Sequence, residues 1–138
     1  MPMITYDEDG FVRGFSYHDG FLEGVLTEDG RKQVHLALRA VSGERNLLTL
    51  RHVIAFHTGN FREGNIVLNL RMLSPDRASK DGEIRRSLMD RVLLDVGTLP
   101  HDSMIFLLEA SFGAEVLAVC REVEVSEGGL ALSRSAPG

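Results

Sequence analysis

The middle of the chain alternates between apolar and polar residues, which is the pattern of a strand with one buried face. The alternation is clearest in residues 32–41, where one face consists of Val34, Leu36, Leu38 and Ala40. Residues 65–72 repeat it, with Ile66, Leu68, Leu70 and Met72 on one face. We also expect strands over residues 15–27, with a bulge or bend near Gly20, and over residues 47–57.

Short turns separate these four segments. Glu28-Asp29-Gly30 supplies the first, because an Asp-Gly pair accepts the positive φ angles of a tight hairpin. Residues 42–46 and 58–60 supply the next two. Parallel neighbours would need long crossover connections, so these short turns predict antiparallel pairing.

After Ser74-Pro75 the apolar spacing changes to that of a helix. The stripe consists of Ile84, Leu88, Met89, Val92, Leu93 and Val96. Asp81 is placed to cap the first turn, and Gly97 can take the left-handed position after the last one. The pattern therefore predicts a helix over about residues 81–96, and a strand from Val92 to Val96 is the competing interpretation.

Two further strands are predicted over residues 104–111 and 115–125, which are rich in apolar and β-branched residues. The fold class is therefore mainly β, or α+β. We expect a single antiparallel sheet or flattened barrel of about six strands, with one helix packed on it. A chain of this length usually builds one core, so residues 1–138 are expected to form a single domain. Residues 1–10 and 127–138 offer few apolar groups, and we expect these ends to be poorly ordered.

Composition limits the class of protein, the partners and the cellular compartment that we expect. The chain has 138 residues, and its 43% hydrophobic share excludes disorder over the whole length. Its 15 basic and 20 acidic residues give a net charge of -5, so we expect no binding to nucleic acid. The single Cys120 forms no intrachain disulfide, which favours the cytoplasm. No signal peptide is expected at Met1 to Ile4, and no apolar run is long enough to span a bilayer, so we expect no membrane attachment.

Tyr17-His18-Asp19 is one candidate site. A neutral imidazole beside a carboxylate can act as a base or hold a metal. Neighbouring residues of a strand point to opposite faces, so His18 and Asp19 can meet only if the chain bends near Gly20. The competing interpretation is that these residues merely shape that bend.

The loop over residues 59–65 is the second candidate, because it gathers Arg62 and Glu63 with two asparagines and Phe61. Loops held by rigid strands often carry binding residues. Its competing interpretation is a polar hairpin connection whose Phe61 packs on the sheet edge.

No catalytic constellation is evident in the sequence. The five histidines lack the spacing of a zinc site, and Cys120 is expected to be a buried, inert thiol. There is no nucleophile elbow and no phosphate-binding loop. We therefore expect no catalytic residues, no metal and no cofactor.

These observations favour a non-catalytic module that binds a protein partner or a second copy of itself. One helix leaves part of the sheet uncovered, and residues 47–56 are expected to carry apolar side chains on both faces. The alternative is a small enzyme or small-ligand-binding domain, whose site is formed by Tyr17, His18, Asp19, Arg62 and Glu63. The alternative requires His18 and Arg62 to line one pocket, whereas self-association requires an exposed apolar patch.

Overall fold

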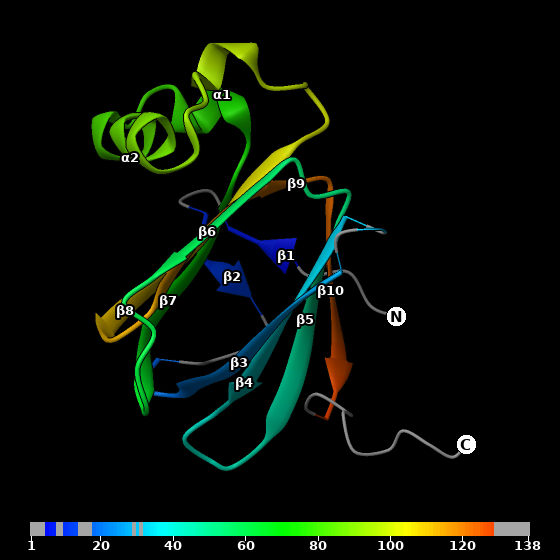
Figure 1. Cartoon of the computed structure of the whole chain (residues 1–138), viewed down its shortest axis with the longest axis vertical. Coiled ribbons are helices and arrows are strands. Elements are labelled where there is room, and N and C mark those ends of the chain that lie inside the picture. The colour runs from blue at the N-terminus through cyan, green and yellow to red at the C-terminus, as the bar shows by residue number, and fades with distance from the viewer. Residues whose placement is uncertain (1–4, 8–9, 14–17, 29, 31, 129–138) are drawn as a thin grey trace.

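The computed structural model describes residues 5–7, 10–13, 18–28, 30 and 32–128. Within these ranges, eight strands form one antiparallel sheet in the order β10-β5-β4-β3-β7-β8-β9-β6 (Figure 1). They are β3 (Phe21–Glu28), β4 (Gln33–Arg39), β5 (Arg45–Arg51), β6 (Ala55–Gly59), β7 (Asn65–Leu73), β8 (Met104–Phe112), β9 (Glu115–Cys120) and β10 (Glu122–Glu127). Two short strands, β1 (Thr5–Tyr6) and β2 (Val12–Arg13), pair with each other. The expected mainly β, antiparallel fold class is confirmed.

The described strands outnumber the expected six because two long segments bend sharply. Residues 47–57 divide into β5 and β6 around His52, whose φ of 53° turns the chain. Residues 115–125 divide into β9 and β10 at Arg121. The backbone N–H of Ile54 donates to Val119, and that of Arg121 donates to Arg51, so the two segments stay paired around the bend. The sheet is strongly curled but open, with β10 and β6 at its two ends.

The main core fills the inside of this curl. Alternation predicted the inward face of β4 correctly, since Leu36 and Leu38 are fully buried. The prediction for β7 is wrong in part. Register shifts near Val67 place Val67, Leu70 and Met72 in the core, and Leu68 is left 37% exposed. Bulges of this kind reverse the side on which later residues point, and the alternation of residue types does not reveal them.

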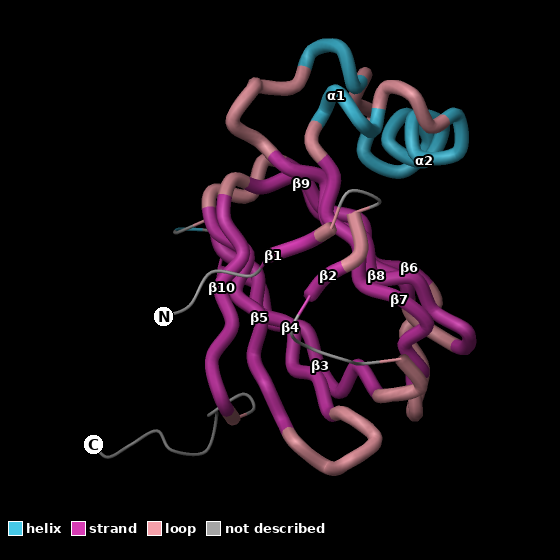
Figure 2. Tube along the Cα trace, turned by 180° about the vertical axis from the view of Figure 1, so that it is seen from behind, coloured by secondary structure: helices cyan, strands magenta, loops and turns pink. Residues whose placement is uncertain are grey.

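Helices cover part of the outer face of the sheet (Figure 2). They are α1 (Pro75–Ala78), α2 (Gly82–Val92) and the 3-10 turn η2 (Val96–Thr98). A second apolar cluster lies between them and β7, β8 and β9, and it includes Leu73, Ala78, Ile84, Leu88, Val96, Ile105, Leu117 and Val119. Among the described residues, no helix is both apolar enough and long enough to pass through a membrane.

The predicted helix is present but shorter than expected. Asp81 caps its first turn as predicted, because its carboxylate accepts the N–H groups of Glu83 and Ile84. The helix ends at Val92, and Leu93 rather than Gly97 takes the left-handed position, with a φ of 58°. The competing strand over residues 92–96 does not form.

The N-terminal segment makes more contact with the sheet than the sequence predicted. Phe15 to Tyr17, expected in the first strand, lie outside the described residues, and β3 begins at Phe21. The chain turns at Asp19, whose φ is 64°, so the expected bend near Gly20 is present. A separate register shift in β3 lies between Leu22 and Gly24. The carbonyl of Gly10 accepts the N–H of Met72 at 2.7 Å, which ties the β1–β2 segment to β7. The expected poor order of the two ends stays a prediction.

Candidate functional site

The first predicted site lies on a turn that docks against β7. Tyr17 is outside the described residues. His18 donates its Nδ1–H to the carbonyl of Leu68 at 2.9 Å, and its Nε2 lies 3.7 Å from the carboxylate of Asp19. Asp19 has a φ of 64°, and its N–H donates to Val67. The chain therefore turns and brings His18 and Asp19 together, but both side chains are largely exposed.

The second predicted site lies further along the sheet. Arg62 donates its backbone N–H to the side chain of Asn65, and its guanidinium carbon lies 6.0 Å from the centre of the Phe112 ring. Glu63 is exposed. Within the described ranges, no hydrogen bond, ion pair or ring contact joins Arg62 or Glu63 to His18 or Asp19. The combined ligand site stays a prediction.

Arg62 instead belongs to a surface that we call the Phe112 patch. It consists of Phe21, Arg39, Arg62, Ile66 and Phe112. Strand register places Phe21 opposite Ile66, and Ile66 opposite Phe112, so three apolar side chains form a row across β3, β7 and β8. An arginine lies near the ring at each end of this row: Arg39 is 4.4 Å from the centre of the Phe21 ring, and Arg62 approaches Phe112. Phe112 is 50% exposed, so the row is open to a partner.

The buried side chain of Asn65 connects the segments that form this patch. It is 1% exposed, and its side-chain oxygen accepts the N–H groups of Arg62 at 2.7 Å and Ala114 at 2.8 Å. Its amide nitrogen donates to the carbonyl of Leu22 at 3.3 Å. One buried side chain therefore connects the loop that carries Arg62 and the hairpin that carries Phe112 to strand β3.

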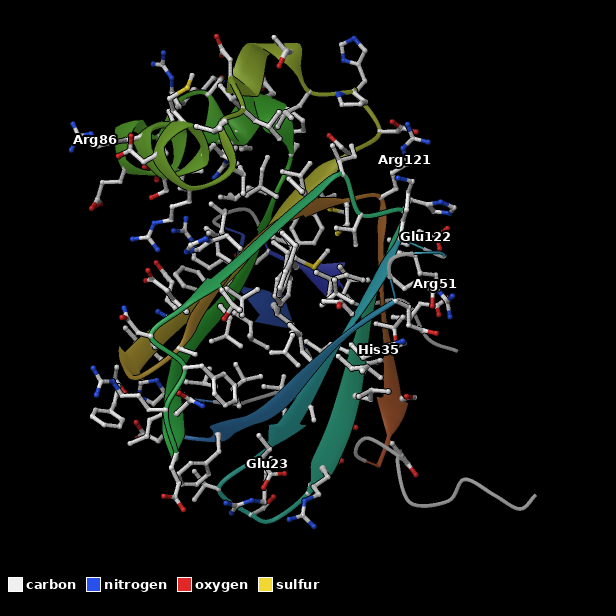
Figure 3. The ribbon with its side chains drawn as sticks, viewed as in Figure 1. Glu23, His35, Arg51, Arg86, Arg121 and Glu122 are labelled. Atoms are coloured by element: carbon white, nitrogen blue, oxygen red, sulfur yellow. The ribbon has the colours of Figure 1, made fainter. Side chains whose placement is uncertain are left out.

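An ion-pair cluster borders the patch at the end of the sheet (Figure 3). Glu23 accepts from Arg39 at 2.9 Å and from Arg45 at 3.0 Å. The two guanidinium groups stabilise the ionised carboxylate and lower the pKa of Glu23, with the hydrogen bond from Arg45 contributing most. The cluster holds Arg39 in place over Phe21.

A polar network crosses the other half of the outer face, where Figure 3 shows His35 and Arg51. His35 donates its Nε2–H to Glu28 at 2.5 Å, and its Nδ1 lies 2.9 Å from the hydroxyl of Thr49. Arg51 binds Glu124 at 2.8 Å. Residues on neighbouring strands thus satisfy one another, as in a structural ladder.

This network corrects one expectation. Residues 47–56 were expected to carry apolar side chains on both faces. In β5, however, the register with β4 places Asn46, Leu48 and Leu50 on the inner face. The outer face carries Leu47 between polar residues, so this part of the sheet has little apolar surface to cover.

A cleft separates α2 from the sheet, and we call it the α2 cleft. Its volume is about 240 Å³. Its lining comes from α2 and its cap, β7, β8 and β9, and consists of Arg71, Asp81, Glu83, Ile84, Ser87, Arg91, Leu107, Leu108, Glu109, Glu115, Val116 and Leu117. Arg91 and Glu115 form an ion pair that joins the helix to β9.

The described residues offer little support for a nucleophilic site or a metal site. Cys120 is fully buried, and burial raises the pKa of its thiol to about 12. A thiol that stays protonated is a poor nucleophile. In this part of the chain, no group of three His, Cys, Asp or Glu side chains is placed to hold a metal ion.

The sequence alone pointed to Arg62 and to the loop that ends at Asn65, but it missed the buried role of Asn65, and it missed Phe112 and the α2 cleft. Their roles depend on strand register and on helix placement, which bring distant segments together. An asparagine directly before an alternating strand was the available signal for Asn65, and it does not indicate burial. Comparison of the chain with protein-family models, with curated proteins and with solved structures finds no match.

Proposed function

We propose that the chain is a non-catalytic self-association module and that a second copy binds at the Phe112 patch. The observation that carries the proposal is the row of Phe21, Ile66 and Phe112, with Arg39 and Arg62 at its ends. Aromatic residues, including Phe, and Arg are enriched at protein interfaces relative to the rest of the protein surface. Phe61, next to Arg62 in the chain, is also 50% exposed.

Charge favours a second copy over an unrelated partner. Arg62 and Glu63 are adjacent and exposed, and neither forms an ion pair with another described residue. In a two-fold interface, each residue of a contact occurs on both sides. Arg62 of one copy can therefore meet Glu63 of the other, and the same contact forms twice.

The patch is also held rigid before binding. Asn65 fixes the Arg62 loop and the Phe112 hairpin through hydrogen bonds to its buried side chain. Segments that are already ordered lose less conformational entropy on association, which favours affinity.

The setting that fits this function is the cytoplasm, without nucleic acid, membrane or cofactor. A net charge of -5 opposes binding to a phosphate backbone. A single buried thiol needs no oxidising compartment.

Sedimentation equilibrium of purified variants tests the proposal. We expect the wild-type chain to dimerise, and the variants Phe112→Ala and Arg62→Glu to dissociate at least about tenfold more easily. Val41→Ser is the matched control, because Val41 is 69% exposed but lies outside the patch.

Charge exchange separates a two-fold contact from a general loss of folding. The double variant Arg62→Glu/Glu63→Arg should recover dimerisation that Arg62→Glu loses, because the exchanged charges attract again. A wild-type chain that stays monomeric at high concentration would refute the proposal. So would a dimer that neither patch variant weakens. If Phe112→Ala and Arg62→Glu instead abolish a complex with a different protein, the patch is a binding site for that protein.

A further inference from the structure

We propose that the outer side of α2 binds an acidic peptide segment of a partner protein, which carries one large apolar side chain between its carboxylates. The surface, which we call the Leu93 ridge, consists of Arg85, Arg86, Met89 and Leu93. It shares no residue with the Phe112 patch, so the inference goes beyond self-association and does not depend on it. Exposed apolar side chains, arginines without an internal partner and a hollow beside them carry the inference.

The apolar side chains of the ridge are open to solvent. Leu93 is 80% exposed and Met89 is 47% exposed. Leu93 ends the last turn of α2, and Met89 lies one turn before it. Ile84 and Leu88 of the same helix pack toward the sheet and are buried. The core therefore uses one side of the helix, and Met89 and Leu93 remain available to a partner.

Folding alone does not explain a leucine at position 93. Its φ of 58° is the left-handed conformation that glycine adopts most readily at the end of a helix. A leucine there strains the backbone, and its exposed side chain gains little packing in return. Residues held in such conformations cluster at functional sites. A partner that covers Leu93 would supply the hydrophobic stabilisation that folding leaves unused.

Two arginines flank the apolar pair. Arg85 and Arg86 are exposed, and neither guanidinium group forms a hydrogen bond or an ion pair with another described residue. Figure 3 shows Arg86 on the side of α2 that points away from the sheet. The arginines lie four and three residues before Met89, so both are its neighbours on the helix surface. A local basic surface on a chain with a net charge of -5 complements an acidic partner.

A hollow beside the ridge can receive the apolar side chain of the partner. Its volume is about 310 Å³. Its lining comes from α2 and the start of η2 and consists of Gly82, Arg85, Arg86, Met89, Asp95 and Val96. The exposed thioether chain of Met89 and the aliphatic stems of the arginines give it apolar walls. The carboxylate of Asp95 already accepts the N–H of Gly97 at 2.9 Å, so the two guanidinium groups dominate the charge of the hollow.

Other occupants fit the ridge less well. A second copy bound ridge to ridge would bring the arginines of both copies together, and like charges repel. Asp90 is exposed one turn after Arg86 and would repel a continuous anionic surface, such as a membrane or a phosphate backbone. A peptide can place its few carboxylates beside the arginines and away from Asp90. Stable membrane attachment also takes more than two apolar side chains.

Selection from a library of random short peptides displayed on phage tests the proposal. The full chain is the target, and the double variant Arg85→Glu/Arg86→Glu is selected in parallel. On the wild-type chain we expect enrichment of peptides that combine Leu, Ile or Phe with neighbouring Asp or Glu. The double variant should not enrich them. An absence of enriched peptides, or an enriched family without acidic residues, would overturn the proposal.

Single variants then locate the site, with fluorescence anisotropy of the most enriched peptide as the measurement. Leu93→Gly should weaken binding at least about tenfold, because the apolar contact is lost. Glycine relieves the backbone strain at this position, so a loss of folding cannot account for weaker binding. Leu93→Met keeps an apolar side chain and should retain binding. Equal affinity of Leu93→Gly and the wild-type chain would overturn the assignment.

A charge control and a vesicle assay complete the test. Lys32→Glu makes the same charge reversal in the exposed turn between β3 and β4, and it should leave peptide binding unchanged. Vesicles of phosphatidylserine and phosphatidylcholine should not sediment with the chain. Sedimentation with these vesicles that Arg85→Glu/Arg86→Glu abolishes would identify a membrane surface and refute the proposal. A loss of self-association in Leu93→Gly would show that a second copy occupies the ridge instead.

Discussion

Asn65 and Gly113 lie so close together that a methyl group on Gly113 would overlap the side-chain oxygen of Asn65. The same oxygen accepts the N–H of Ala114, the next residue of the hairpin. Gly113 also has a φ of 84°, which residues with a side chain rarely adopt. This turn between β8 and β9 therefore needs glycine for two independent reasons, and Asn65 supplies one of them.

Replacing Gly113 separates these two reasons. Gly43 has a φ of 95°, and no other atom lies near the position that a side chain would take. Gly43→Ala should therefore lower the free energy of unfolding only by the cost of a positive φ, about 1 kcal/mol. Gly113→Ala adds the overlap with Asn65 and should destabilise the fold by about 3 kcal/mol. Urea unfolding of both variants measures the difference. Equal losses would show that the hairpin moves away from Asn65 at little cost.

Removing the Asn65 side chain should be nearly as damaging. Asn65→Ala leaves the buried N–H group of Ala114 and the partly buried N–H group of Arg62 without their acceptor. We expect a loss of about 2–4 kcal/mol in the free energy of unfolding, because unsatisfied buried donors carry their full desolvation penalty. Asn69→Ala is the control, at a half-buried position in the same strand, and should change stability by less than about 1 kcal/mol. Similar effects of the two substitutions would contradict the role assigned to Asn65.

The contrast between Asn65 and the β4 strand shows what the sequence can predict here. Alternation identifies the inward face of β4, because Leu36 and Leu38 follow from local pattern alone. The bends at His52 and Arg121 convert two expected strands into four, and nothing in the residue types marks them. The shared curl of the sheet depends on these bends.

The candidate site, like the bends of the sheet, could be predicted from the sequence only in part. Arg62 was recognised as a binding candidate from its loop, and the turn at His18 and Asp19 forms as proposed. The contact between Arg62 and Phe112 depends on how β7 aligns with β8. That register includes shifts near Val67, and short-range patterns cannot predict it.

The end of α2 offers a stabilising substitution. Leu93 has a φ of 58° and is 80% exposed, so its side chain contributes little packing while its backbone is strained. Leu93→Gly should therefore raise the free energy of unfolding by about 0.5–1 kcal/mol. The neighbouring Leu94→Gly should lower it, because Leu94 packs against the helical apolar cluster. Thermal unfolding of the two variants would disprove the strain argument if Leu93→Gly also destabilised the protein.

The Glu23 cluster predicts a weak acid dependence. The pKa of Glu23 is lowered by Arg45 and Arg39 from an ordinary value of 4.5, so the ionised form favours the folded state. This contribution is complete above pH 4.5 and is lost as the pH falls through the lowered pKa. Glu23→Gln should cost less than about 1 kcal/mol near neutral pH, since the cluster is partly exposed, and nothing in strong acid. A constant effect of Glu23→Gln across this range would argue against the ion pairs.

Cys120 predicts the opposite behaviour at alkaline pH. Burial raises the pKa of its thiol from 9.0 to about 12, so the folded state keeps the proton when the unfolded state loses it. Stability is unaffected below pH 9.0 and falls as the pH rises between 9.0 and about 12. The loss is about 1.4 kcal/mol for each pH unit in this window. Other groups also titrate in this window. The measurement therefore compares the free energy of unfolding in urea of the wild-type chain with that of Cys120→Ala, once at about pH 8 and once at about pH 10. The advantage of the wild type should shrink by about 1.4 kcal/mol between these two values, and an unchanged difference would show that the thiol ionises equally well in both states.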